Sequence, residues 1–246
     1  MAEPTTVYVL LVIFLATLIR STLGFGEALV AVPLLALRIP IAVAAPLAVL
    51  VSVVVAAMIV VQDWNKIQFR PAAGLILASL LGIPLGLLLL TRANDQLVRI
   101  ILAIVILGFS VYSLTARSRL HLEKDHLLWL LGCGFLSGVF GGAYGMNGPP
   151  LAIYGSLRRW SPQHFRATLQ GYFLPASLLG LIGYAWIGLW TAPVTRYFLL
   201  SFPGILAAIL AGRVVNHRLR GDRFFSIIYI GLIVIGLTLL VQAVTA

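Results

Sequence analysis

The sequence predicts an all-α polytopic membrane protein built from two inverted repeats, each a broken-helix hairpin followed by three transmembrane helices. The overall composition indicates a membrane protein. Hydrophobic residues make up 61% of the 246 residues and charged residues only 10%, and the mean hydropathy is +1.07. About a quarter of the residues in a typical soluble protein are charged. No soluble fold could hide this much apolar surface, so membrane lipid is the expected surrounding of most of the chain.

The lengths of the apolar runs predict how often the chain crosses the membrane. A spanning helix needs roughly 20 apolar residues. Six runs meet that requirement, at 41–61, 71–91, 97–115, 165–187, 194–214 and 224–244. Two further apolar stretches, 5–38 and 127–157, are interrupted by polar or glycine-rich segments at 20–27 and 141–150. Each of these stretches is long enough for two short helices with a break between them.

The breaks also bear on function. Broken backbone within a membrane is tolerated only where it is buried in protein or lines a wet cavity. Paired discontinuous helices near the midplane are typical of transporter binding sites. The alternative is a set of ordinary packing helices, because glycine is common in membrane helices. The pattern divides the chain into repeats at 1–116 and 117–246, in which Gly24 corresponds to Gly141 and Pro33 to Pro150.

The basic residues predict the orientation. If each broken stretch returns to its starting side, one side of the membrane holds twelve of them: Lys66, Arg70, Arg117, Arg119, Lys124, Arg158, Arg159, Arg166, Arg213, Arg218, Arg220 and Arg223. The other side holds four: Arg38, Arg92, Arg99 and Arg196. Single crossings at the broken stretches would divide them ten against six. Cytoplasmic loops are enriched in Lys and Arg. The hairpin arrangement is therefore favoured, with both termini outside the cytoplasm, and the net charge of +10 indicates orientation rather than a nucleic-acid partner.

The sequence contains few of the cysteine and histidine residues that metal and redox sites need. Cys133 is the single cysteine, and His121, His126 and His217 have no second ligand at metal-binding spacing. The sequence has neither an H-E-x-x-H nor a G-x-S-x-G pattern. It therefore predicts no metal site, no cofactor and no enzyme, with a membrane-embedded enzyme as an alternative class.

Three segments carry a family resemblance. They are LGFGEALVAVPLL at 23–35, SGVFGGAYGMNGPPLAIY at 137–154 and FRATL at 165–169. They resemble the two half-motifs of the TauE/SafE sulfite and organosulfonate exporters, a family that includes proteins similar to 4-toluene sulfonate uptake permeases. The resemblance covers essentially the whole chain.

The resemblance implies a multi-pass protein of the bacterial inner membrane. Its expected partner is a small sulfur-containing anion such as sulfite, sulfoacetate or another organosulfonate. The expected function is secondary transport, as an exporter that works by alternating access, with protons as a further partner if transport is proton-coupled. An anion channel and a structural membrane subunit are the alternatives, and the sequence does not determine an oligomeric state.

A site for a small oxyanion needs hydrogen-bond donors and positive potential, and helix N-termini supply both. The second helix of each broken stretch is expected to begin near Gly26 and near Pro149, with its N-terminus towards the anion. Glycines would let the anion approach backbone N–H groups, while Asn147 and Tyr144 would add side-chain donors. The substrate-binding residues predicted in the breaks are Gly24, Gly26, Gly142, Tyr144, Gly145, Asn147 and Gly148. Alternatively, these residues only complete and pack the turns.

Polar residues beside the breaks complete the predicted site. An arginine at membrane depth, Arg20, is a functional candidate by default. It could bind the anion, pair with Glu27 or snorkel to an interface. Glu27 is the one acidic residue expected within the membrane, so it is the candidate for proton coupling, with ion pairing or helix capping as alternatives. Arg166 and Gln170 share a helical face and are predicted to line an inner vestibule, unless Arg166 only anchors the orientation.

Overall fold

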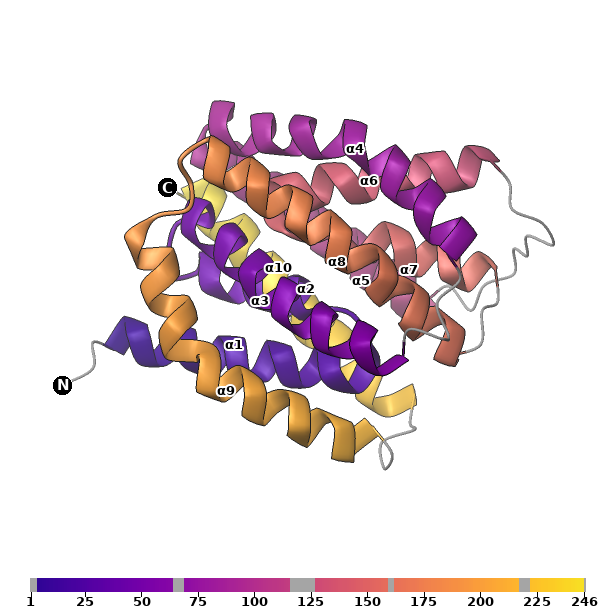
Figure 1. The fold of residues 1–246 in the computed structure, drawn as a ribbon. Helices are drawn as coiled ribbons and strands as arrows, with labels where there is room; N and C mark the ends of the chain where they lie inside the picture. The colour runs from indigo at the N-terminus through magenta and orange to yellow at the C-terminus, as the bar shows by residue number, and fades with distance from the viewer. Residues whose placement is uncertain (1–3, 64–68, 116–126, 159–161, 217–221, 246) are drawn as a thin grey trace.

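The structure, a computed structural model, describes residues 4–63, 69–115, 127–158, 162–216 and 222–245. The described part is entirely helical, which confirms the predicted all-α class (Figure 1). Its ten helices are α1 (Pro4–Leu23), α2 (Glu27–Ala36), α3 (Ile41–Asp63), α4 (Phe69–Arg92), α5 (Asp95–Thr115), α6 (Leu127–Tyr144), α7 (Gly148–Leu157), α8 (Pro162–Trp186), α9 (Ala192–Asn216) and α10 (Asp222–Thr245).

Seven of these helices are long and apolar enough to cross a bilayer: α1, α3, α4, α5, α6, α9 and α10. Helix α8 has 25 residues but does not reach that hydropathy within the described residues. Three of its polar residues, Thr168, Gln170 and Ser177, are buried inside the protein. A long helix that turns polar side chains inwards can still present an apolar face to lipid. The chain is thus a multi-pass membrane protein, as the apolar runs predict.

The two broken stretches differ from the sequence prediction in one respect. Each contains a break, but the helix before the break is not short. Helix α1 has 20 residues and α6 has 18, and both are long enough to span a bilayer. Only the helices after the breaks, α2 and α7, are short, with 10 residues each. The prediction of two short helices in each stretch is therefore wrong for α1 and α6.

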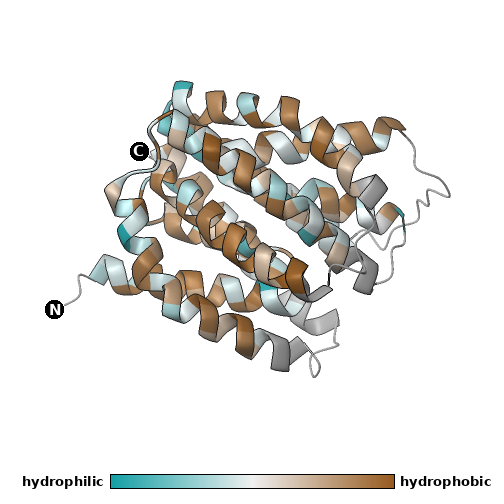
Figure 2. Ribbon diagram, in the orientation of Figure 1, coloured by the Kyte–Doolittle hydropathy of each residue, from teal (hydrophilic) through white to brown (hydrophobic). Residues whose placement is uncertain are grey.

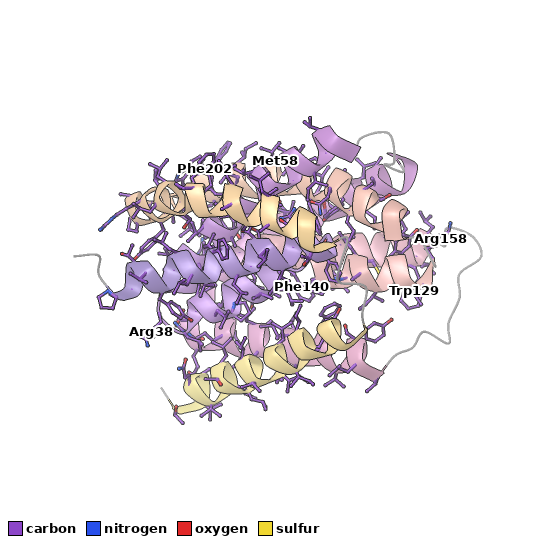
Figure 3. The ribbon with its side chains drawn as sticks, turned by 90° about the horizontal axis from the view of Figure 1, so that it is seen from below. Arg38, Met58, Trp129, Phe140, Arg158 and Phe202 are labelled. Carbon is purple, nitrogen blue, oxygen red and sulfur yellow. The ribbon has the colours of Figure 1, made fainter. Side chains whose placement is uncertain are left out.

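The termini of the helices lie at two opposite ends of the bundle. Helix α1 begins and α10 ends at the same end, on the left of Figure 1. Figure 3 shows Arg38 at that end and Arg158 at the opposite end. This is the arrangement expected if both broken stretches return to their starting side.

Contacts between the two halves of the chain dominate the packing. The main helix pairs are α4 with α6, α1 with α9, α5 with α10 and α3 with α8. Each pair joins one helix from residues 1–116 to one from residues 117–246. The halves are therefore interlocked, and neither could bury its helices without the other.

Apolar side chains cover the outside of the bundle. Leu81, Leu128 and Val61 are among many large hydrophobic residues that remain exposed, and hydrophobic residues run along the lengths of the helices in Figure 2. Polar residues such as Arg20 and Glu27 are buried instead. This distribution suits a protein whose outer surface meets lipid, because contiguous apolar patches of this extent are rare on soluble monomers.

A seam of glycines joins α4 to α6 with backbone against backbone. A Cβ atom added at Gly82 would lie 2.2 Å from the carbonyl oxygen of Phe135, and one added at Gly138 would lie 2.4 Å from that of Ser79. Five glycines have such contacts across this pair: Gly82, Gly86, Gly134, Gly138 and Gly142. Small residues allow this close approach, which is a principal source of helix association in membranes.

Replacing Gly138 by Ala is expected to destabilise the protein by about 1–3 kcal/mol, because its new methyl group would meet backbone that cannot move aside cheaply. Gly132→Ala is the matched control on the same helix, where an added Cβ meets no atom within 4 Å. It should be neutral or up to about 1 kcal/mol stabilising, because alanine favours the helix. Thermal unfolding in detergent measures both. Equal melting temperatures for the two variants would contradict the seam.

Candidate functional site

Glycines in the left-handed region end the first helix of each broken stretch. Gly24 has φ 86° and follows α1, and Gly145 has φ 66° and follows α6. Both N–H groups donate to a carbonyl four residues back, Gly24 to Arg20 at 2.6 Å and Gly145 to Gly141 at 2.8 Å. Glycine is the residue that most readily adopts this helix-ending conformation.

These turns correct the predicted correspondence between the repeats. Gly24 matches Gly145, not Gly141, because each ends its helix. Pro33 lies inside α2, whereas Pro150 lies in the first turn of α7, so these prolines do not correspond. Several glycines occur before each break, and only the backbone angles distinguish the one that ends the helix.

A small cavity lies where the two breaks meet. It has a volume of about 20 Å³, room for roughly one water molecule. The starts of α2 and α7 both line it, so two helix N-termini with partial positive charge face the same space. The lining residues are Arg20, Gly26, Glu27, Ala28, Leu29, Ser52, Gly145, Met146, Asn147, Gly148, Pro149 and Phe173.

Arg20 is the cation at this cavity, and its residue is only 2% exposed. Its Nη1 pairs with the Glu27 carboxylate and also donates to the Ser52 hydroxyl at 2.8 Å. Its Nη2 donates to the Gln170 side-chain oxygen at 2.8 Å. The guanidinium carbon lies 5.1 Å from the centre of the Phe173 ring, within the range of a cation–π contact. The Nε–H has no hydrogen-bond partner in the described part of the chain.

Helix α8 ties these groups to the break in the first half. The side-chain nitrogen of Gln170 donates to the carbonyl oxygen of Gly24, while its side-chain oxygen accepts from Arg20. The hydroxyls of Ser52 on α3 and Ser177 on α8 are 3.1 Å apart. The arginine is therefore held by α1, α2, α3 and α8 together, which fixes its position at the cavity.

Glu27 is the anion at the cavity. It is 2% exposed and accepts hydrogen bonds from Arg20 and, at 3.2 Å, from the Thr17 hydroxyl. It stands in the first turn of α2, where the helix dipole favours a negative charge. Asp95 is the other acidic residue whose burial the structure describes, and it is exposed. The pairing of Arg20 with Glu27 is one of the alternatives that the sequence left open.

The two helix N-termini at the cavity differ in what they can donate. The first N–H groups of a helix have no acceptor within it. Glu27, Ala28 and Leu29 open α2 and line the cavity, and the residue before them, Gly26, has no side chain to cap them. Two of the first three residues of α7 are prolines, which lack an N–H. Backbone donors therefore come mainly from α2.

Asn147 provides a polar side chain next to α7. It is 6% exposed and lines the cavity. Its carbonyl oxygen accepts from the Ser137 hydroxyl at 2.7 Å, which fixes the backbone of the second break. Its side chain lies against Gly141, where a Cβ would approach to 2.6 Å. Because Gly141 has no side chain, it leaves room for the side chain of Asn147.

Most of the predicted site residues meet at the cavity, but not all. Arg20, Gly26, Glu27, Gly145, Asn147 and Gly148 line it. Gln170 and Gly24 join through hydrogen bonds. Gly142 lies in the seam with α4, and the Tyr144 hydroxyl donates to the carbonyl of Val98 at 2.9 Å, so neither lines the cavity. The side chain of Arg166 lies outside the described residues.

Sequence reasoning missed six contributors: Thr17, Ser52, Ser137, Phe173, Ser177 and Tyr184. The Tyr184 hydroxyl donates to the carbonyl of Gly142 at 2.8 Å and supports the end of α6. Ser52 gives a usable signal, because it is the single polar residue in the apolar run 41–61. No such signal marks Phe173 or Tyr184.

The described residues contain no group of three or more His, Cys, Asp or Glu side chains that could hold a metal ion. The polar groups at the cavity are an ion pair, hydroxyls and amides. They can bind and orient an anion.

Comparison with known proteins agrees with these features. The sequence profile of the family described as sulfite exporter TauE/SafE matches residues 9–239. Searches among curated proteins and among solved structures gave no match. The match spans both breaks, the cavity and nearly every helix of the bundle. The chain therefore belongs to the TauE/SafE sulfite exporter family of membrane transporters.

Proposed function

We propose that this protein is a secondary transporter of small sulfur-containing oxyanions, such as sulfite, sulfoacetate or another organosulfonate, and that it exports them by alternating access. One observation carries the proposal. The buried guanidinium of Arg20 lines a cavity between two helix N-termini and keeps its Nε–H free of any partner in the described part. Family membership supplies the substrate class. Guanidinium groups and backbone amides are the donors that oxyanions bind best.

The anion would lie against the start of α2. Arg20, Ala28 and Leu29 all line the cavity there. The side chain of Asn147 would donate from the opposite break, and Gly26 and Gly148 would allow close approach. Gln170 would position Arg20 rather than touch the anion, because its side chain already bonds Arg20 and Gly24.

The size of the cavity supports a carrier over a channel. A volume of about 20 Å³ holds roughly one water molecule, which is less than an oxyanion with three or four oxygen atoms needs. Side chains or helices must move before the anion can enter. A channel needs a continuous path for conduction, whereas a carrier closes around its site between openings.

Two inverted repeats, 1–116 and 117–246, would produce the alternating openings. The helix pairs support this division. If α1 to α5 are matched in order with α6 to α10, the pair α1–α9 becomes α6–α4, while α3–α8 and α5–α10 map onto themselves. All four are main contacts of the bundle. Proton coupling would use Glu27, the buried carboxylate at the cavity.

Replacing Arg20 by Gln removes the guanidinium from the cavity. We expect anion flux in proteoliposomes to fall about ten- to a hundredfold, the value of one charge-assisted hydrogen bond. Arg92→Gln is the matched control, because Arg92 is exposed at the end of α4. It should leave flux unchanged.

Removing Arg20 alone also leaves Glu27 buried without its partner, which costs about 3–5 kcal/mol and could unfold the protein. The double variant Arg20→Gln, Glu27→Gln separates the two effects. It should regain most of the lost melting temperature, because no buried charge remains, and its anion flux should stay about ten- to a hundredfold below that of the wild type. Wild-type flux through a folded double variant would remove Arg20 from the substrate site.

Asn147→Asp tests the second break without changing the size of the side chain. The added carboxylate would repel the anion at the cavity, so we expect at least about a tenfold loss of flux. Asn94→Asp is the matched control, since Asn94 accepts from the N–H of Leu97 at 2.8 Å at the start of α5 and aspartate caps a helix equally well. The proposal for this break does not survive if both variants keep wild-type flux.

A further inference from the structure

The cavity has an internal balance of charge. Arg20 and Glu27 are its two charged lining residues among those described, and their side chains are 3% and 2% exposed. They are of opposite sign and paired, so the empty site has no net charge. A guanidinium does not release its proton in proteins, whereas a carboxylate can gain one.

The other elements around this ion pair bring neutral groups. Thr17 comes from α1, Ser52 from α3, Asn147 from the second break, and Gln170 and Ser177 from α8. All of these groups are buried and uncharged.

Charged residues on the helices packed against α2 lie elsewhere. Asp95 and Arg99 on α5 form an ion pair at the other end of α2, where Arg99 donates to the carbonyl of Ala36 at 2.6 Å. Helix α7 has no charged residue, nor does α10 over 228–245, the part whose side chains the structure describes. Among the side chains that the structure describes, the charge at the cavity therefore depends on Arg20 and Glu27.

We infer that this protein carries its substrate as a monoanion together with one proton, which is held on Glu27, so that neither the loaded nor the empty carrier moves net charge. The inference rests on the proposed transport function and adds the charge class of the substrate. When Glu27 takes up the proton, its carboxyl becomes neutral and its electrostatic attraction to Arg20 weakens. The monoanion then takes the place of the carboxylate beside the guanidinium.

The charge of each state follows directly. The empty carrier has Arg20 positive and Glu27 negative, and the loaded carrier has Arg20 positive, Glu27 protonated and the substrate negative. Both sum to zero. A dianion at the same site would leave an uncompensated buried charge, which costs several kcal/mol in a low-dielectric interior. The site therefore favours hydrogen sulfite or a sulfonate with a single charge over sulfate, and also over sulfoacetate, whose carboxylate makes it a dianion at neutral pH.

The coupling has a measurable consequence. Membrane potential acts at about 2.3 kcal/mol per elementary charge per 100 mV, but it has no charge to act on here. The anion gradient and the pH gradient alone determine the direction. At equilibrium, a difference of one pH unit should concentrate the monoanion about tenfold on the alkaline side.

Proteoliposomes with the wild-type protein and ethanesulfonate as the probe test this inference. One set carries a one-unit pH gradient with the potential clamped at zero by K⁺ and valinomycin. The other carries a K⁺ diffusion potential of about 100 mV without a pH gradient. We expect accumulation in the first set and none in the second. Sulfate, a dianion, should compete at least about tenfold more weakly than ethanesulfonate.

Glu27→Gln changes the driving force in a defined way. Its empty carrier would hold the uncompensated charge of Arg20, while its loaded carrier would be neutral. Accumulation should therefore respond to potential and lose its response to pH. Asp95→Asn is the matched control, because Asp95 lies outside the site and is exposed. It should keep the wild-type response to both gradients.

The outcomes separate this inference from the proposed function. Potential-driven accumulation by the wild type, or equal competition by sulfate, overturns the inference and leaves anion transport intact. Folded wild-type protein that moves neither ethanesulfonate nor sulfite under either gradient overturns the proposed function and the inference with it. If Glu27→Gln does not fold, the two wild-type gradients still decide the question.

Discussion

A buried ion pair between Arg20 and Glu27 determines how the centre of this protein is built. An arginine inside a membrane protein cannot shed its charge, so the fold must neutralise it and satisfy its donors. Glu27 supplies the charge, while Ser52 and Gln170 accept two further hydrogen bonds. These partners come from α2, α3 and α8, so one guanidinium joins four helices from both halves of the chain. The break at Gly24 is fixed through the same network, because Gln170 also bonds its carbonyl.

The two halves of the chain contribute different groups to this centre. The first brings the charges and a helix start whose opening residues all carry an amide N–H. The second brings Asn147 and a helix start whose prolines cannot donate. It also holds its break rigidly, because α6 packs on α4 through glycines and Tyr184 bonds the carbonyl of Gly142. If an anion binds at this cavity as proposed, the electrostatic change would be confined to the first half, which holds both charged lining residues among those described.

Much of this could be predicted from the sequence, for clear physical reasons. Lipid demands apolar runs of fixed length, so hydropathy locates the helices, and scarce charges such as Arg20 and Glu27 stand out within them. The rest depends on contacts between distant helices. Ser177 and Phe173 matter because α8 turns one face towards Arg20, and the hydropathy of α8 does not reveal that face. The matching of Gly24 with Gly141 failed because glycines are frequent before the second break. Only the left-handed backbone of Gly145 identifies the residue that ends α6.

If Arg20 binds the substrate as proposed, its pairing with Glu27 would also limit leakage. With Glu27 on Arg20, the cavity holds roughly one water molecule and the positive charge is already neutralised. An anion entering without a change at Glu27 would meet a carboxylate and a space too small for it. In the proposed mechanism, the contact between Arg20 and Glu27 would therefore exclude the substrate until the carboxylate leaves the guanidinium. Packed interiors switch between discrete arrangements rather than deform continuously. Opening is thus expected to follow the break-up of the ion pair, with the glycine-packed α4 and α6 moving together as one unit.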